Sequence, residues 1–325
     1  MLAGGRIRRL VREPCRDTHT GTSKGGFPLV KVGLVDCDTS HVVQFALRMN
    51  HVEIAEDQWV EGAQVVAAYR GTSEITPEET IGQYVEKLQG FGIEMVGSPE
   101  EMIGKVDAVC VESQSGYAHL ERVTPFLKAG LPCFVDKPFA CTVEDARAMA
   151  ELARANNAAL FSASSLRYGL EIVEALQDEA VGPVVGAMTY SPAPIHDRNP
   201  GLFHYGIHAV EPLYALMGRG CKSVTCTFTE GGEVVTGLWR DGRVGSLRGT
   251  RAGAHAYGFT VWGEKGVKSS GINAAYIYRE LLKQMVCMFA TNEPPLDIEE
   301  SVEIVSFIVA ALKSAENGGV PMALS

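Results

Sequence analysis

The sequence predicts an α/β protein in which a Rossmann-like, doubly wound parallel sheet precedes an α+β domain with a mainly antiparallel sheet. From Lys31 to about residue 155, short apolar strands alternate with amphipathic helices, which is typical of a parallel sheet covered on both faces. After about Phe161 the chain becomes strand-rich, with Gly-Gly, Asp-Gly and Gly-Glu-Lys-Gly turns that favour antiparallel hairpins. We therefore expect a dinucleotide-binding domain over 29–155 and a substrate and oligomerisation domain over 156–325.

The elements of the first domain follow one another at short intervals. A strand over 31–36 leads into a helix that ends near Met49. The order continues with strands over 63–69, 92–97, 106–112 and 132–138, and with helices from about 77, from 99, over 117–130 and from 143. Ser98 and Glu101 predict a capping box, and Thr142 with Asp145 predicts another helix start. Two further helices, over 275–290 and 298–316, are expected near the C-terminus.

Composition excludes several classes of protein. The chain of 325 residues is 46% hydrophobic and 21% charged, and its net charge of −10 argues against a nucleic-acid surface. No apolar run approaches the ~18–20 residues of a membrane helix. The eight cysteines are scattered without a Cys-x-x-Cys pair, which favours a reducing, cytoplasmic location. Residues 1–28 are Arg-rich and lack hydrophobic periodicity, so we expect a disordered basic tail, with a transit peptide as the alternative.

The turn after the first strand has the outline of a dinucleotide-binding loop, but Asp36, Asp38 and His41 stand where its three glycines would be. A carboxylate about 4 Å from a phosphate costs roughly 1 kcal/mol in water and about 4 kcal/mol at an effective dielectric near 20. A helix N-terminus stabilises a negative charge by only ~0.3–1 kcal/mol. Asp38 is also a good N-cap, and as a cap it would use backbone N–H groups that a phosphate would otherwise bind. Pyrophosphate binding should therefore be weakened, shifted outward or mediated by a cation, with Thr39 and Ser40 as remaining hydroxyl donors.

Other polar residues should meet this turn at the same edge of the sheet. The carboxyl ends of parallel strands share one edge, and Lys137 directly follows a strand there. In the second domain, His204, His208 and Glu211 would share one face of a helix. Two histidines and a carboxylate suit general base chemistry, and they also suit a metal ion, for which His196 could add a fourth ligand.

Several stretches together resemble the glucose–fructose oxidoreductase/inositol dehydrogenase (Gfo/Idh/MocA) family. The most specific is "AGLPCFVDKPFACTVEDARAMAELA", which is similar to the Glu-Lys-Pro stretch of that family, with Asp136 in place of Glu. Further matches are "GYAHLERVTPFLKAG", "ASSLRY", "GEKG" and "FATNEPPLDIEESVEIVSFIVAALKSAENGGVPMAL". The resemblance extends from Lys31 to the C-terminus.

The resemblance implies an NAD(P)-dependent oxidoreductase acting on a sugar, polyol or related carbonyl compound. By position, Lys137 would polarise the reacting oxygen and His208 would be the general base, since histidine titrates near neutrality. The family usually has an Asp four residues before that histidine. Here the residue is His204, for which a proton relay or a ligand role would be needed, and Glu211 stands where the family often has Asp.

The remaining site predictions are less specific. Arg70, at the end of the second strand, slightly favours NADP over NAD, because an arginine there suits a 2′-phosphate. The resemblance suggests that Ser113 and Gln114 line the nicotinamide half of the cofactor site. The candidate substrate contacts are Arg167, His196, Glu211, Arg251 and His255.

Three hypotheses stay open at this point. The first is the redox enzyme, which requires no metal ion. The second is a metal-assisted lyase or hydrolase on the same scaffold, motivated by the histidine pattern. The third is a non-catalytic sugar-binding protein that has lost the glycine-rich loop. In each case the expected partners are a small molecule and further copies of the chain, joined through the C-terminal sheet.

Overall fold

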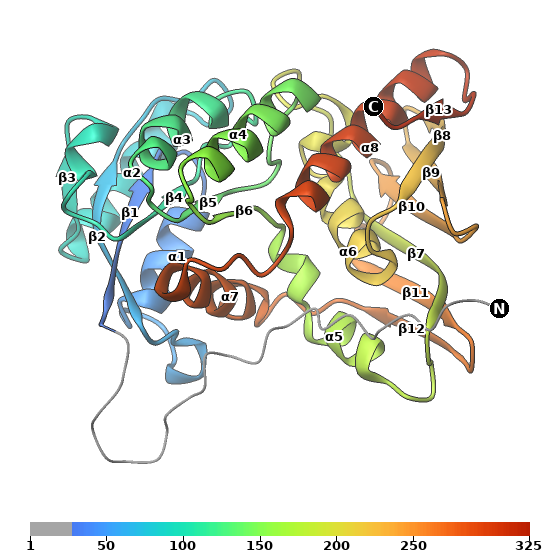
Figure 1. The fold of residues 1–325 in the computed structure, drawn as a ribbon, viewed down its shortest axis with the longest axis horizontal. Helices are drawn as coiled ribbons and strands as arrows, with labels where there is room; N and C mark the ends of the chain where they lie inside the picture. Colours follow the sequence, from blue (N-terminus) through green and yellow to red (C-terminus); the bar gives the residue numbers. More distant parts are fainter. Residues whose placement is uncertain (1–27) are drawn as a thin grey trace.

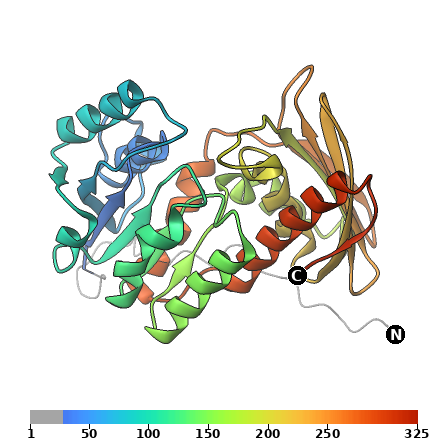
Figure 2. The same cartoon turned by 90° about the horizontal axis from the view of Figure 1, so that it is seen from above.

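The structure is a computed structural model that describes residues 28–325. The tail expected over 1–28 lies outside the described residues apart from Pro28. Two sheets lie at opposite ends of the molecule, and helices fill the space between them (Figures 1 and 2). One sheet is fully parallel and the other mainly antiparallel, so the predicted fold class is confirmed.

The first sheet has six parallel strands in the order β3-β2-β1-β4-β5-β6. These strands are β1 (Val30–Val35), β2 (Ala63–Tyr69), β3 (Glu94–Val96), β4 (Ala108–Val111), β5 (Cys133–Val135) and β6 (Leu160–Phe161). The order reverses between β1 and β4, and ligands of such sheets bind in the crevice outside the carboxyl ends at this point. All four residues of β4 are buried, as expected for a strand covered on both faces.

The helices that cover this sheet are α1 (His41–Met49), α2 (Glu78–Gly90), α3 (His119–Lys128) and α4 (Val143–Ala155). The Thr142 cap of α4 is confirmed, because its hydroxyl accepts a hydrogen bond from the Asp145 amide at 3.0 Å. The expected capping box at Ser98 is wrong. The segment Pro99–Met102 is a single 3₁₀ turn, the Ser98 side chain makes no cap bond, and the Glu101 carboxylate accepts instead from the Gly97 amide.

The second sheet has seven strands in the order β12-β11-β7-β10-β9-β8-β13. They are β7 (Val184–Pro192), β8 (Cys221–Thr229), β9 (Gly232–Trp239), β10 (Val244–Thr250), β11 (Gly258–Gly263), β12 (Val267–Gly271) and β13 (Met322–Ala323). Helices α6 (Ile207–Met217) and α8 (Ile298–Glu316) pack on one face. The strand register brings six exposed apolar side chains together on the other face: Met188, Val234, Leu238, Val244, Trp262 and Val267.

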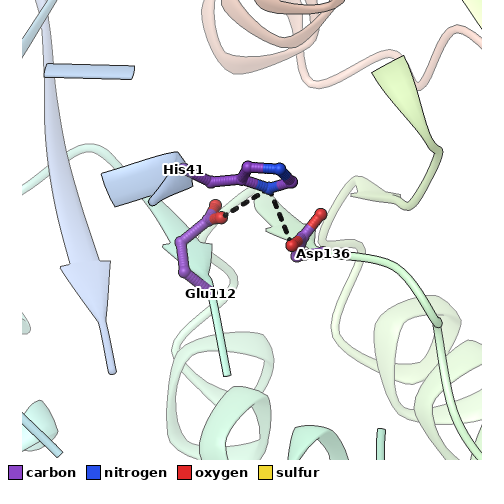
Figure 3. A group of neighbouring side chains, drawn as sticks. All are labelled: His41, Glu112 and Asp136. Atoms are coloured by element: carbon purple, nitrogen blue, oxygen red, sulfur yellow. Dashed lines mark ion pairs between the residues drawn. The ribbon is translucent and has the colours of Figure 1, made fainter. Parts of the chain in front are cut away.

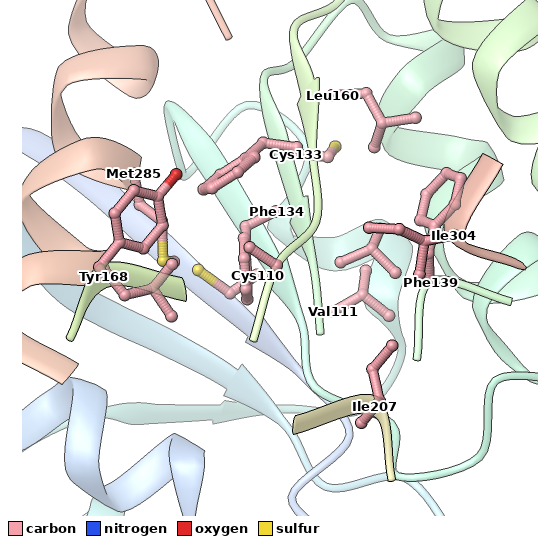
Figure 4. Packing of buried hydrophobic residues seen from close by; sticks show 14 of the residues in the cluster. Cys110, Val111, Cys133, Phe134, Phe139, Leu160, Tyr168, Ile207, Met285 and Ile304 are labelled. Carbon is pink, nitrogen blue, oxygen red and sulfur yellow. The ribbon is translucent and has the colours of Figure 1, made fainter. Parts of the chain in front are cut away.

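The two halves of the chain share a continuous core. Helix α7 (Ile277–Thr291) returns from the second sheet to pack beside α1 and β1, while α5 (Leu170–Gln177) lies near β12 (Figure 1). Figure 4 shows Met285 of α7 near Cys110 and Phe134 of the first sheet, and Ile304 of α8 near Phe139. The domain boundary near residue 155 stays a prediction. Among the described residues, no helix is long and apolar enough to cross a membrane.

Candidate active site

A cavity of about 580 Å³ lies between the carboxyl edge of the first sheet and the second half of the chain. Its floor comes from the β1–α1 turn and from Lys137 after β5, and its opposite wall comes from α6, α7 and the segments before them. Eight residues predicted for the site line it: Asp38, Thr39, Ser40, Gln114, Lys137, His196, His204 and His208. Eight do not: Asp36, Arg70, Ser113, Asp136, Arg167, Glu211, Arg251 and His255.

Lys137 reaches the cavity floor from a largely buried position. Its Nζ lies 3.7 Å from Oδ2 of Asp136, the residue before it, and only 7% of the lysine is exposed. Burial alone would raise the pKa of Asp136, but the His41 and Lys137 charges outweigh burial and hold that pKa below its ordinary value. Asp136 therefore stays ionised and fixes the position of the lysine amine.

His208 lines the same cavity as Lys137 and lies in the first turn of α6. Its Nδ1 lies 2.7 Å from the Ser164 hydroxyl, and the Tyr205 and Tyr257 rings meet it edge-on at 4.9 and 6.0 Å. Burial, followed by the Lys137 charge, lowers the pKa of His208 well below its ordinary value. The imidazole is therefore neutral at physiological pH, and Nε2 is the ring nitrogen left to act on a ligand.

His208 and Glu211 lie three residues apart in α6, as the sequence predicts, but His204 does not belong to that helix. His204 precedes α6 and lines the cavity, with its ring 5.1 Å from that of His196. Glu211 points instead toward Arg167, whose Nε donates to it at 2.7 Å. The three predicted ligands are thus not brought together.

Arg167 is not positioned to contact a substrate. Its guanidinium is 1% exposed and lies between two buried carboxylates, with Nη2 at 2.8 Å from Glu300 in addition to the Glu211 bond. Two buried charges around a buried arginine form a structural ion pair. The charged lining of the cavity is therefore supplied by lysine, histidine and Asp38.

Asp36 is paired rather than directed at a ligand. Its carboxylate accepts hydrogen bonds from the Ser113 hydroxyl at 2.6 Å and from Nε of Arg122 at 3.0 Å. The backbone of Asp36 has a φ of +65°, so the tight turn that a glycine would supply is kept. A Cβ at Gly71 would lie 2.0 Å from the Asp36 Oδ1, so only glycine fits beside this carboxylate. The expected repulsion of a pyrophosphate by Asp36 is therefore compensated by Arg122.

Asp38 does not cap α1, although the sequence predicts that it does. Ser40 occupies the cap position without a side-chain bond, while Asp38 accepts from the Gln114 amide at 2.9 Å and so ties β1 to β4. Burial raises the pKa of Asp38 to about 6. Its charge at neutral pH would oppose a pyrophosphate bound at this turn.

This shift predicts how stability depends on pH. Because the folded state binds the Asp38 proton more tightly than the unfolded state, its contribution is greatest below about pH 4 and is lost as the pH rises through about 6. Asp38→Asn should therefore be more stable than the wild type by roughly 1–3 kcal/mol at pH 7.5, and this gain should shrink toward pH 4. Urea unfolding across this range measures it, with the exposed Glu86→Gln as control. A gain that does not vary with pH would contradict the assignment.

The predicted nicotinamide contacts are held in place by neighbours. The Ser113 hydroxyl donates its hydrogen bond to the Asp36 carboxylate. Gln114 lines the cavity, and its Oε1 accepts a hydrogen bond from the Thr76 hydroxyl at 2.6 Å. Arg70, the residue that favours NADP, forms an ion pair with Glu78. Its guanidinium is thus already engaged, and a preference for NADP stays a prediction.

A cluster of three buried side chains was missed from the sequence (Figure 3). Nδ1 of His41 lies 2.8 Å from Oδ2 of Asp136 and 3.8 Å from Oε2 of Glu112. Glu112 directly follows β4 and is 0% exposed, and burial followed by the Asp136 charge raises its pKa well above the ordinary value. The only sequence signal was an acid ending the apolar run Ala108–Val111.

These features define a Rossmann-type protein with a lysine–histidine cavity between its two sheets. Residues 49–164 match the family model described as "Oxidoreductase family, NAD-binding Rossmann fold", the Gfo/Idh/MocA family. The resemblance seen in the sequence is thereby confirmed, and residues 49–164 are similar to this NAD-binding oxidoreductase family. No curated protein matches the chain at the level of sequence.

Solved structures share the fold over nearly the whole chain. A probable dehydrogenase from Thermotoga maritima has 20% identity and a TM-score of 0.73, covering 91% of this chain and 99% of its own. A putative myo-inositol dehydrogenase from Sinorhizobium meliloti has 16% identity and a TM-score of 0.73, covering 91% and 100%. An oxidoreductase from Agrobacterium radiobacter, solved with NAD⁺, L-tartaric acid and magnesium, has 15% identity and a TM-score of 0.70, covering 91% and 98%.

Proposed function

We propose that this protein is an NAD(P)-dependent oxidoreductase that transfers hydride to or from a sugar, polyol or related carbonyl compound. The observation that carries the proposal is that Lys137 and His208 line one cavity at the carboxyl edge of the first sheet. The family match adds the class of cofactor. The inositol dehydrogenase among the similar structures is in keeping with a polyol as substrate.

The cavity residues fit a bound dinucleotide. The Thr39 and Ser40 hydroxyls line the cavity at the start of α1, where a helix N-terminus favours a pyrophosphate. The Asp36 carboxylate is turned away to Arg122, so it does not oppose the phosphates as the sequence suggests. Gln114 would lie along the nicotinamide half, which is the half that exchanges hydride when the cofactor is bound.

The two groups facing the cavity have complementary roles. The Lys137 ammonium, fixed by Asp136, donates a hydrogen bond to the reacting oxygen and stabilises negative charge that develops there. His208, neutral because it is buried, accepts the hydroxyl proton of an alcohol substrate at Nε2 while Nδ1 is held by Ser164. In the reducing direction the same imidazole returns the proton.

Direct measurements of binding test the proposal. Titration of the purified chain with NADH and NADPH should change the cofactor fluorescence, and the comparison of the two reports the predicted NADP preference. Intact mass under native conditions should show bound dinucleotide together with the number of subunits. No fluorescence change at millimolar cofactor, and no bound cofactor by mass, would overturn the redox assignment and leave the non-catalytic alternative.

We also propose that the exposed apolar face of the second sheet joins copies of the chain and that the protein is cytoplasmic.

Arg122 supplies a sharper test of the altered loop. Arg122→Gln should weaken dinucleotide binding by about 1 kcal/mol or more, because the Asp36 carboxylate then acts on the phosphates without compensation. The double variant Asp36→Asn/Arg122→Gln should bind nearly as well as the wild type. Equal loss in the single and double variants would show that Arg122 acts by another route.

A further inference from the structure

The His41, Glu112 and Asp136 cluster has unused bonding capacity. Both Glu112 carboxylate oxygens and the Asp136 Oδ1 are buried without a hydrogen-bond partner in the described residues. Nδ1 of His41 and Oδ2 of Asp136 approach to 2.8 Å, yet neither makes a directed hydrogen bond. Buried carboxylates in proteins are normally paired or bind a metal, so these atoms need a further cation.

The charges nearby do not meet this need. Lys137 Nζ approaches Oδ2 of Asp136, the same oxygen that faces His41, and no lysine or arginine within residues 28–325 pairs with Glu112. The Lys137 ammonium therefore pairs with Asp136, and its Nζ is not in an ion pair with Glu112. The carboxyl group that lacks a lysine or arginine partner is that of Glu112, which is the most deeply buried of the three residues.

The arrangement of the ligand atoms matches a metal site. The imidazole nitrogen and one oxygen from each carboxylate all lie within 4.8 Å of one another. Bonds of about 2.0–2.2 Å place neighbouring ligand atoms roughly 2.8–3.1 Å apart around an octahedral ion and roughly 3.3–3.6 Å apart around a tetrahedral one. Of the observed separations from Nδ1, 2.8 Å lies at the lower end of this span and 3.8 Å slightly above it. Side-chain shifts of a few tenths of an ångström would equalise them.

We propose that His41, Glu112 and Asp136 bind one divalent transition-metal ion, with Zn²⁺ or Mn²⁺ as the fitting class. One imidazole nitrogen and two carboxylate oxygens suit these ions better than Ca²⁺ or Mg²⁺, which prefer oxygen ligands alone. His41 lines the cavity, so the remaining coordination positions face the space where substrate would bind. The site uses none of the three ligands that the sequence suggested, and it does not depend on dinucleotide binding.

The test uses the full chain stripped with a chelator and then loaded with Zn²⁺ or Co²⁺. We expect one ion per chain, a higher melting temperature with Zn²⁺, and visible d–d absorption with Co²⁺. Glu112→Gln and His41→Gln should each lose at least a hundredfold in affinity and lose these signals. Asp38→Asn and His196→Gln, which also alter cavity-lining residues, should retain them.

Melting temperatures of the metal-free proteins show whether loss of metal binding in a variant is caused by misfolding. Without metal, Glu112→Gln replaces a buried carboxyl group whose oxygens have no hydrogen-bond partner among the described residues, so its melting temperature should equal or exceed that of the apo wild type. Wild-type protein that binds well under one ion per chain at excess metal would overturn the proposal and indicate that a proton on Glu112 balances the cluster. Retention of metal by both ligand variants would also overturn it.

Discussion

Lys137→Met should lower kcat/KM by roughly 10²–10⁴-fold for whichever sugar or polyol the protein turns over. Methionine keeps most of the side-chain volume but removes the ammonium group that the proposed mechanism assigns to the reacting oxygen. Dinucleotide affinity should change little, because the loop that would hold the phosphates is built from Thr39 and Ser40. Steady-state kinetics together with a fluorescence titration separate the two effects.

Matched variants make this result specific. Lys105→Met removes an exposed lysine that pairs with Glu94 at the surface, and it should leave kcat/KM unchanged. Lys137→Arg keeps the charge but not the compact ammonium, so it should recover only part of the activity. Loss of dinucleotide binding in parallel with activity in Lys137→Met would mean that Lys137 organises the cofactor site rather than the reacting oxygen.

The fold was predictable because each of its signals is local. The alternation of apolar strands and amphipathic helices sets the parallel sheet, and the Gly-rich turns set the hairpins of the second. Thr142 could be predicted as a cap because it bonds to an amide only three residues away. Lys137 was predictable by the same kind of reasoning, since a residue that directly follows a parallel strand must lie at the ligand-binding edge.

The errors arise where a distant residue decides the outcome. Asp36 is held by Arg122, which is 86 residues away, and no local pattern shows that pairing. Helical periodicity places Glu211 on the same side of α6 as His208, but it does not show that Arg167, 44 residues away, binds that carboxylate. Glu112 meets His41 only because the strand order places β4 beside β1. The contacts of these charged side chains therefore depend on partners that are distant in the sequence, and sequence spacing does not reveal those partners.

Arg167→Met should produce the largest loss of stability, about 3–5 kcal/mol in the free energy of unfolding. Burial alone would lower the pKa of the guanidinium, but Glu211 and Glu300 outweigh burial and raise it above the ordinary value. Methionine would leave Glu211 buried without the Arg167 Nε bond, and burial already raises the pKa of that carboxyl. Urea or thermal unfolding near pH 7 measures the loss.

The surface offers a matched control, because Arg154 forms an ion pair with Glu299 that is half exposed. Arg154→Met should cost under about 1 kcal/mol, since exposed pairs contribute little. The triple variant Arg167→Met/Glu211→Leu/Glu300→Leu should recover most of the stability, because replacing all members of a buried ion cluster by apolar residues leaves no buried charge unpaired. If Arg167→Met were as stable as the wild type but bound substrate poorly, Arg167 would be a substrate-binding residue, as the sequence analysis predicts. The cavity would then have to extend to the Glu211 side of α6, which is closed in this structure.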